Sequence, residues 1–424
     1  MKDFGATGNG TTNDAKAIDA AIVACSKSGG GIVHFPPGRY ISGTIHVKSN
    51  ITVDISPGAT IAMGSDDDVD DIEELGYDPG ADHETIYFRP SLFYLDGIEN
   101  ACIQGGGRID GNRSRRLGPK TIAVKRCTRV TIRDITIVNA PNYAISFIDS
   151  ENLDVNNVRI ANAFADGIDL DGCRFARVSN CRVDSRDDAI CLKSSPALGE
   201  QIDCAHVVIT NCILLTSATC FKLGTESGPG DFTDITVSNC TFAQLPGTNA
   251  HPGGISILSV DGAAIERLAI ANITMHQISS PICLRLGRRG RGQKTPTPGS
   301  LQDISITGIV ATDASFPCVI SGVPGYRVKN VAIQDVGISF DTASAKHHVE
   351  TIVRPADVPE FEDKYPDSGM FGALPAWAFY CRHADNVKVR RTQARIDASL
   401  ANKKDAVVLD DVLHSHVEID KILL

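Results

Sequence analysis

The sequence predicts an all-β fold of one kind, a right-handed parallel β-helix, and three observations lead to it. Short runs of alternating apolar and polar residues recur along the chain, as in Ile235-Thr236-Val237 followed by Asn239-Cys240. Successive copies lie about 23 to 33 residues apart, a spacing typical of solenoids, and no long amphipathic helix separates them. Gly is abundant (38 residues) and aromatic residues are few (6%), which suits many short strands joined by tight turns.

The bend between the two runs of each copy carries Asn or Asp in most cases. Asn tolerates a left-handed backbone φ and can hydrogen-bond neighbouring backbone, so we expect the bend residues of stacked coils to form a ladder. The apolar positions should form one continuous core, in which each coil contacts only its neighbours. The expected bend residues are Asp134, Asn157, Asn180, Asn211, Asn239, Asn272, Gly308 and Asp335.

We expect residues 1–424 to form a single β-helix domain. Residues 1–60 would hold the N-terminal cap and the first coils. Within them, the spacing of apolar residues predicts a helix over residues 14–24, with Asn13 or Asp14 as its N-cap. A helix at this place could plug the open end of the solenoid.

Two segments interrupt the repeat. Residues 66–74 are strongly acidic and are predicted to form a solvated loop. Residues 345–378 carry many prolines and charges, which indicates a long excursion before the last coils.

Composition narrows the classes of function. The formal net charge of −10 argues against general nucleic-acid binding. No apolar run reaches the roughly 18 residues of a membrane span, so no membrane association is expected. No signal peptide is visible at Met1, so the chain is expected to be cytoplasmic, or secreted or periplasmic if a leader was removed. The oligomeric state stays open.

The 13 cysteines are an odd number, so they cannot all pair within the chain. Several follow Asn at repeat positions, as in Asn180-Cys181, and others, such as Cys191, lie inside strand-like runs. We interpret most of them as small buried apolar residues. No CxxC pair occurs, which argues against a zinc site. We expect no metal and no cofactor, and the redox state of the cysteines stays open.

Three consecutive coils, near residues 166, 187 and 222, place polar residues where the strand pattern should turn. Because stacked coils lie about 4.8 Å apart, we expect Asp166, Asp187 and Asp188 to gather within a few coils. Alternation with period two points apolar residues such as Ile168 and Leu170 inward. The same alternation directs outward Asp169, Asp171, Cys191, Lys193, Lys222 and Arg285.

A group of carboxylates suits the hydrolysis of a glycosidic bond. One carboxyl must donate a proton to the leaving oxygen, and another must be ionised to activate water or to attack directly. Crowding among carboxylates helps one of them to keep its proton. A single Asp at a solenoid turn usually only hydrogen-bonds backbone. The adjacent pair Asp187-Asp188, with Asp166 one coil earlier, favours the catalytic interpretation, because like charges in register reduce stability.

The stretch from Arg285 to Lys294 is strongly basic within an acidic protein. It is either a solvated loop or a binding segment for the carboxylates of a uronic acid chain. The isolated His251 and His276 are expected in loops or on the surface. The predicted substrate-binding residues are Arg285, Lys222, Asp169, Lys193, Glu226 and Arg288.

At these residues the chain resembles the family-28 glycoside hydrolases, the polygalacturonase family, over nearly its whole length. Asp166-Gly167-Ile168-Asp169 resembles the family's Asn-Thr-Asp-Gly motif, and Asp187-Asp188 resembles its paired aspartates. Further matches are the opening Lys2-Asp3-Phe4-Gly5-Ala6, Gly224-Thr225 of the Gly-His-Gly region, Arg285 of the Arg-Ile-Lys motif, and a late segment containing Tyr365-Pro366 and Phe379-Tyr380-Cys381-Arg382-His383.

The resemblance implies a pectin-lyase-like solenoid and an inverting hydrolase that degrades pectin, a plant cell wall carbohydrate. Asp187 would be the general acid, and Asp166 and Asp188 would hold and deprotonate the attacking water. Arg285 would bind a substrate carboxylate or the sugar at the cleavage point. The substrate would be an acidic polysaccharide or oligosaccharide of the galacturonan or rhamnogalacturonan type.

The chain departs from the family pattern at three places. Phe164-Ala165 stand in place of Asn-Thr, Thr219 in place of the histidine, and Gly287 in place of the final lysine of Arg-Ile-Lys. A rhamnogalacturonan hydrolase, or an enzyme for another uronate-containing oligosaccharide, therefore fits at least as well as a polygalacturonase.

Two other interpretations stay open. The first is a lyase on the same fold that holds Ca²⁺ with Asp166, Asp187 and Asp188 and uses Lys222 or Arg285 as the base. The second is a solenoid that binds carbohydrate without turning it over. The fold alone cannot separate these functions, because function depends on the site.

Overall fold

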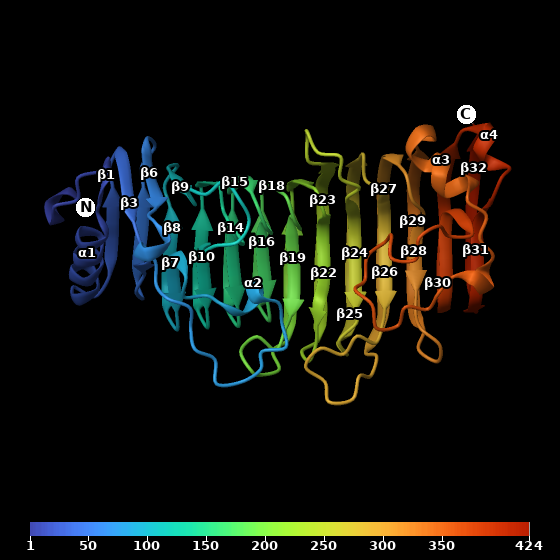
Figure 1. Ribbon diagram of the computed structural model, residues 1–424, viewed down its shortest axis with the longest axis horizontal. Coiled ribbons are helices and arrows are strands. Elements are labelled where there is room, and N and C mark those ends of the chain that lie inside the picture. Colours follow the sequence, from blue (N-terminus) through green and yellow to red (C-terminus); the bar gives the residue numbers. More distant parts are fainter. Residues whose placement is uncertain (424) are drawn as a thin grey trace. The chain divides into compact units, whose positions relative to one another are not determined.

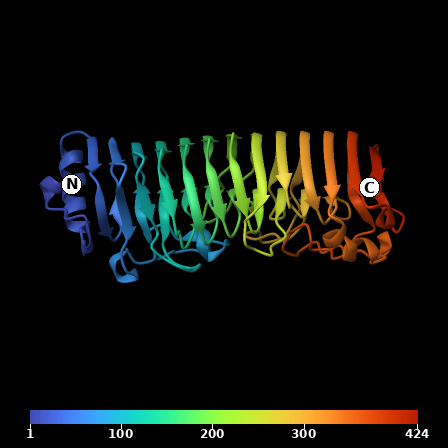
Figure 2. The same ribbon diagram turned by 90° about the horizontal axis from the view of Figure 1, so that it is seen from above.

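The computed structural model describes residues 1–423 and contains two compact units. The N-terminal unit comprises residues 1–191, 197–200 and 206–213, and the C-terminal unit comprises 192–196, 201–205 and 214 onward. In each unit, short strands pair in parallel with the equivalent strands of neighbouring coils (Figures 1 and 2). This arrangement is the predicted parallel β-helix.

The strands up to residue 185 are β1 (Asn9–Asn13), β2 (Gly31–Phe35), β3 (Gly38–Ser42), β4 (Ile45–His46), β5 (Ile51–Ile55), β6 (Ala59–Met63), β7 (Ser91–Asp96), β8 (Glu99–Gln104), β9 (Arg108–Asp110), β10 (Lys120–Lys125), β11 (Thr128–Arg133), β12 (Thr136–Val138), β13 (Ile145–Ile148), β14 (Glu151–Asn156), β15 (Arg159–Ala163), β16 (Ile168–Asp171), β17 (Arg174–Ser179) and β18 (Arg182–Ser185).

The later strands are β19 (Ile190–Ser194), β20 (Cys204–Thr210), β21 (Ile213–Thr216), β22 (Thr219–Ser227), β23 (Phe232–Gln244), β24 (Gly253–Ser259), β25 (Ala264–His276), β26 (Ser280–Leu286), β27 (Ser300–Ala314), β28 (Cys318–Ser321), β29 (Val328–Phe340), β30 (Ala376–Ile396), β31 (Asp405–Leu413) and β32 (His416–Leu423). The helices are α1 (Ala15–Lys27), α2 (His83–Ile86), α3 (Thr342–Glu350) and α4 (Ala398–Ala401), with 3₁₀ turns η1 (Lys2–Phe4), η2 (Asp66–Asp68) and η3 (Pro355–Asp357).

Each complete coil of the N-terminal unit contributes one strand to each of three stacks. The stacks are β7–β10–β13–β16, β8–β11–β14–β17 and β9–β12–β15–β18. In the first stack Ile122 pairs with Ile145, and Ile145 pairs with Ile168. These inward residues are fully buried, so the core is a column of aliphatic side chains from successive coils.

The predicted ladder at the bends is present. Its members adopt a left-handed φ, for example 52° at Asn157 and 55° at Asn239. The amide of Asn157 donates to Asp134 at 2.8 Å, and the amide of Asn272 donates to Asn239 at 3.2 Å. Each amide therefore satisfies the equivalent residue of the preceding coil, which holds the bends in register.

The predicted N-terminal helix is α1, which runs three residues beyond the predicted end. It contacts β2, β4 and β5 and buries Ile18, Ala21 and Ile22. Asp14 is the N-cap, but its carboxylate accepts no bond from the helix. It accepts instead from the backbone of Thr7 at 2.7 Å and of Gly8 at 3.0 Å, which ties the opening segment to the helix.

Residues 64–90 form an excursion that is partly fixed to the coils. Asp66 to Asp68 are exposed, as the acidic sequence predicted. However, Asp66 forms an ion pair with Arg113 at 2.6 Å. Further along, the Glu73 carboxylate accepts hydrogen bonds from the backbone N–H of Phe88 and Arg89, at 3.0 and 2.8 Å.

The C-terminal unit has its own excursion, residues 351–375, between α3 and β30. Its side chains Val358, Phe371 and Leu374 are buried in one apolar cluster with Cys283 and Tyr380, which belong to β26 and β30. The excursion is thus attached to the coils through an apolar surface of its own.

All 13 cysteines are free thiols, and all but Cys25 and Cys102 are buried. The interpretation of most cysteines as small core residues is therefore confirmed. No helix among the described residues is long and apolar enough to cross a membrane.

Candidate active site

Asp166 lies in the turn between β15 and β16, where two coils approach closely. The backbone N–H of Gly167 donates to the carbonyl of Asp188 at 2.9 Å. A Cβ atom at position 167 would lie 2.3 Å from Val183 Cγ1 and 2.5 Å from the Ala189 oxygen, so glycine is needed there. The Asp-Gly pair therefore brings Asp166 against the coil that carries Asp188.

The structure brings Asp166, Asp187 and Asp188 together. One oxygen of each carboxylate lies within 4.8 Å of one oxygen of each of the others. The backbone N–H of Asp188 donates to Asp166 Oδ1 at 3.2 Å and to Asp187 Oδ1 at 3.1 Å. Asp166 and Asp188 are buried, whereas the Asp187 side chain keeps 24% of its exposure. Asp187 is thus the member of the cluster that is most open to solvent.

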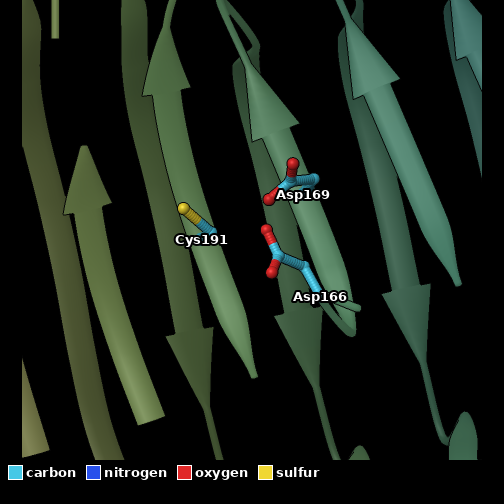
Figure 3. Close-up of side chains that lie close together, drawn as sticks. All are labelled: Asp166, Asp169 and Cys191. Carbon is cyan, nitrogen blue, oxygen red and sulfur yellow. The ribbon is translucent and has the colours of Figure 1, made fainter. Parts of the chain in front are cut away.

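Asp169 and Cys191 form a second group around Asp166 (Figure 3). An oxygen of Asp166, an oxygen of Asp169 and the Cys191 sulfur all lie within 4.8 Å of one another, and the three side chains converge from adjacent coils. All four residues of β16 are buried, including Asp169 and Asp171. The positions predicted to point outward are therefore covered and not open to solvent.

The cluster contains four carboxylates, those of Asp166, Asp169, Asp187 and Asp188. When all of them are ionised they repel one another, and burial weakens the screening by water.

Arg116, in the loop between β9 and β10, forms an ion pair with Asp187. Its Nη1 lies 2.5 Å from Asp187 Oδ2. Its Nε and Nη2 donate to the two oxygens of Glu84, at 2.9 and 2.5 Å, so Glu84 holds the guanidinium in a bidentate pair. The hydrogen bonds to Glu84, followed by the charge of Asp187, raise the pKa of Arg116. Arg116 therefore stays cationic and fixed between the two carboxylates.

Glu84 belongs to α2, and Lys120 holds that short helix against the coils. Lys120 is fully buried on β10. Its ammonium donates to the carbonyls of Glu84 and Tyr87, the latter at 2.8 Å. It also lies over the rings of Phe88 and Tyr143, at 4.5 and 5.0 Å from the ring centres. A buried cation thus positions α2, and α2 positions Arg116.

Lys193 and Glu226, two of the predicted binding residues, meet in the C-terminal unit. Lys193 Nζ lies 3.9 Å from Glu226 Oε2, and both side chains are only 4% exposed. Arg291 approaches the other oxygen of Glu226 at 3.4 Å. Lys222 donates to the hydroxyl of Tyr365 at 3.1 Å. Tyr365 belongs to the excursion, so this segment contributes directly to the surroundings of Lys222.

Arg285 is 2% exposed, and its guanidinium donates to four neighbours. Nη1 donates to Ser321 Oγ and to the Gly322 carbonyl, both at 2.8 Å. Nη2 donates to the carbonyls of Glu360 and Phe361, at 2.8 and 3.2 Å. Burial lowers the pKa of Arg285 to about 10, so it is cationic at neutral pH. In this structure it anchors the excursion, and its predicted contact with substrate stays a prediction.

Arginines of the basic run are held by acidic partners. Arg289 contacts both oxygens of the buried Asp261, the closer at 2.5 Å, and donates to the carbonyl of Thr225 at 2.7 Å. Arg288 pairs with Glu362 at 2.6 Å and keeps 46% of its exposure. The run is therefore bound to its own unit and is not a freely solvated loop.

The structure sorts the predicted residues into separate groups. Asp166, Asp169, Asp187 and Asp188 form one cluster in the N-terminal unit. Lys193 pairs with Glu226, while Lys222, Arg285 and Arg288 each contact the excursion of the C-terminal unit. His251 and His276 are exposed, which confirms their interpretation as surface residues.

Sequence reasoning missed Arg116, Glu84 and Lys120. Three arginines lie within four residues in the loop that carries Arg116, which is unusual in an acidic protein and was the available signal. Nothing in the sequence around Glu84 indicated its partner.

A cluster of carboxylates on a parallel β-helix defines the chain as a candidate glycoside hydrolase. The model of glycosyl hydrolases family 28 matches residues 46–353, most of the chain, and the chain belongs to this family. A second model, of the rhamnogalacturonase A/epimerase, pectate lyase-like group, matches residues 1–56. The predicted family and enzyme class are therefore confirmed, and the chain acts on a polysaccharide.

Similar proteins agree with this assignment. A probable polygalacturonase of Vitis vinifera is 22% identical over 89% of this chain and 83% of its own length. A probable rhamnogalacturonase A of Aspergillus niger is 24% identical over 64% of this chain and 62% of its own length. The structure of a family 28 exopolygalacturonase of Yersinia enterocolitica covers 99% of this chain and 78% of that chain, with a TM-score of 0.75 and 17% identity. This likeness confirms the right-handed parallel β-helix.

Proposed function

We propose that the protein is an inverting glycoside hydrolase that cleaves a bond beside a uronic acid in a pectic polysaccharide or oligosaccharide. The family and the relatives support pectin-degrading glycoside hydrolase activity. The observation that carries the catalytic assignment is the grouping of Asp166, Asp187 and Asp188, with oxygens within 4.8 Å of one another.

We assign the acid role to Asp187 because it is the most exposed of the three and can reach a leaving oxygen. Asp166 and Asp188 are buried and linked through the Asp188 N–H. Two neighbouring carboxylates of this kind can hold a water molecule and accept its proton as it attacks the anomeric carbon. The leaving group takes the proton of Asp187, and the sugar configuration inverts.

The spacing of the carboxylates bears on whether the enzyme inverts or retains the configuration at the anomeric carbon, so this outcome should be tested directly. Inverting enzymes usually separate their two carboxyl groups by about 6.5–9.5 Å, and retaining enzymes by about 5–5.5 Å. The closest oxygens of this cluster lie within 4.8 Å. The inverting assignment follows the family resemblance and the presence of a third carboxylate to hold the water. Proton NMR of the first product formed checks it, because inversion and retention give opposite anomers.

The substrate is expected among galacturonan and rhamnogalacturonan chains. Both types appear in the names of the relatives. Thr219 and Gly287 stand where the family resemblance leads one to expect a histidine and a lysine, so the sugar contacts at those two positions differ. This difference favours a rhamnogalacturonan or another uronate-containing oligosaccharide alongside galacturonan.

The first experiment incubates the protein with polygalacturonan, rhamnogalacturonan and their oligosaccharides, with and without a chelator. Reducing ends and ultraviolet absorbance are followed together. We expect reducing ends without absorbance, insensitive to the chelator. Absorbance that a chelator removes would instead identify a cation-dependent lyase, and binding without any product would identify a carbohydrate-binding protein.

Asp187→Asn tests the acid role, and the expected loss is about 10²–10⁴-fold in kcat, as is usual for removal of a general acid. Asp154→Asn is the matched control. Asp154 is a surface aspartate of the same unit that pairs with Arg177 at 3.4 Å. Equal activity of the two variants would remove Asp187 from the mechanism.

A further inference from the structure

Arg116 and Asp187 form an ion pair, and this ion pair is incompatible with the role of Asp187 as the general acid. The ion pair at 2.5 Å is made by the anionic carboxylate, whereas a general acid must carry a proton. Some event must therefore separate the two before the leaving group can be protonated. The structure indicates which event this is, because Arg116 is held by a second, independent anchor.

That anchor is the bidentate pair with Glu84. It uses Nε and Nη2 of Arg116 and leaves Nη1 directed at Asp187. Glu84 is in turn fixed through the buried ammonium of Lys120, which binds the Glu84 carbonyl. Loss of the contact with Asp187 would thus leave Arg116 in place, cationic and with one N–H edge pointing at the acid.

Arg116 can also be reached by a ligand. Its side chain keeps 44% of its exposure, although its guanidinium binds two carboxylates. A planar guanidinium prefers carboxylate ligands in a shared plane, and a uronic acid supplies one. A uronate at this place would take over the edge now used by Asp187.

We propose that Arg116 is the specificity-determining residue that receives the carboxylate of a uronic acid next to the scissile bond, in exchange for Asp187. This inference rests on the proposed function. When the uronate binds, Arg116 passes from Asp187 to the substrate. The Asp187 carboxylate then takes up a hydronium proton from the solvent and later passes it to the leaving oxygen as the glycosidic bond breaks. A neutral sugar leaves the ion pair intact. The enzyme would therefore discriminate against neutral substrates in kcat as well as in KM.

The test uses the pectic oligosaccharide that the enzyme cleaves best, as the free acid and as its methyl ester. The ester keeps the sugar and removes the charge. For the wild-type protein we expect a kcat/KM about 10- to 100-fold higher on the acid than on the ester, the range of a charged hydrogen bond. Arg116→Gln should lower kcat/KM on the acid by a similar factor and should not lower it on the ester, because loss of the ion pair frees Asp187 to act on a neutral substrate, so that the preference disappears.

Two further variants separate this role from a structural one. Arg116→Lys keeps the charge without the planar fork and should restore part of the preference for the acid. Arg115→Gln, which changes the exposed neighbouring arginine, should behave like the wild type. Thermal unfolding of each variant checks that the fold is intact.

The outcomes are distinct. An equal loss on acid and ester in Arg116→Gln, no loss on either, or a wild type that cleaves both equally well would overturn the role of Arg116 and leave the hydrolase assignment standing. No product from the wild type on any pectic oligosaccharide would instead overturn the proposed function, and this inference with it.

Discussion

At position 167 a single glycine decides how closely two coils approach. The Cβ of any other residue would meet the Val183 side chain and the Ala189 carbonyl. The same close approach carries the hydrogen bond from the N–H of Gly167, which follows Asp166, to the carbonyl of Asp188, a member of the carboxylate cluster. The absence of a Cβ atom at position 167 therefore matters both for the stability of the fold and for the geometry of the site.

We expect Gly167→Ala to destabilise the protein by about 1–3 kcal/mol, because the added methyl group overfills a packed interior. Activity should fall further than stability explains, since the coil that carries Asp188 must shift. Chemical denaturation and kcat on the same sample measure both effects.

The control is Gly337→Ala. Gly337 also lies in a strand, but a Cβ there would meet nothing within 4 Å. We expect this variant to keep both wild-type stability and activity. A Gly167→Ala protein that matched it would show that the coils can separate without strain.

Among the elements, α2 has an importance out of proportion to its four residues. So short a helix is not stable alone, and here a buried lysine on β10 holds it. The helix then carries the carboxylate that positions Arg116. The excursion of residues 64–90 is far from the aspartates in the sequence. It contributes to the site because Lys120 holds Glu84 in place and Glu84 binds Arg116.

Lys120→Met should release α2 without unfolding the coils. The methionine replaces the apolar stem of the lysine but leaves the carbonyls of Glu84 and Tyr87 without their donor, at about 1–3 kcal/mol each. Hydrogen exchange should therefore speed up over residues 83–87, and kcat should fall. Lys125→Met, at the more exposed end of β10, is the matched control. Unchanged exchange over residues 83–87 would mean that other contacts hold the helix.

The strands were predictable and α2 was not, for a physical reason. A strand is encoded locally, because alternation within five residues and one Asn at the bend specify a coil, as at Asn157 and Asn239. The pair Asp187-Asp188 was likewise visible because its members are adjacent. The contact of Glu84 with Arg116 joins two loops that have no periodicity, so only the folded chain shows it.

For the whole molecule, pH should act on stability through His348. This side chain is 6% exposed, donates from Nε2 to the Ala376 carbonyl at 3.0 Å, and contacts the Phe316 ring. Burial lowers its pKa to about 4, well below the ordinary 6.5. The neutral imidazole is therefore the form that the folded chain accepts.

The sign follows from proton binding. Between about pH 6.5 and pH 4 the unfolded chain binds a proton at His348 and the folded chain does not, so stability falls as the pH falls through this range. The full effect is about 3 kcal/mol for a shift of this size. Thermal midpoints at pH 7 and pH 4.5 measure it.

We expect His348→Gln, which keeps a donor for the Ala376 carbonyl, to lose less stability on acidification than the wild type. His347→Gln alters the exposed neighbour on α3 and should keep the wild-type dependence. An identical pH response in all three proteins would assign the acid sensitivity to other groups.

The asparagine ladder also has a consequence for how such a chain can change its length. In the N-terminal unit, rungs such as Asn157 to Asp134 and Asn162 to Asn139 join residues 23 positions apart. Deleting or duplicating 23 residues there would return every surviving rung to an equivalent partner, whereas a change of ten would put the bend residues out of register with those of the neighbouring coils. Heritable length variation is thus expected to come in whole turns, or to be confined to excursions such as residues 64–90. Because the ladder joins equivalent residues of neighbouring coils, insertions and deletions within the coils are expected to add or remove whole coils.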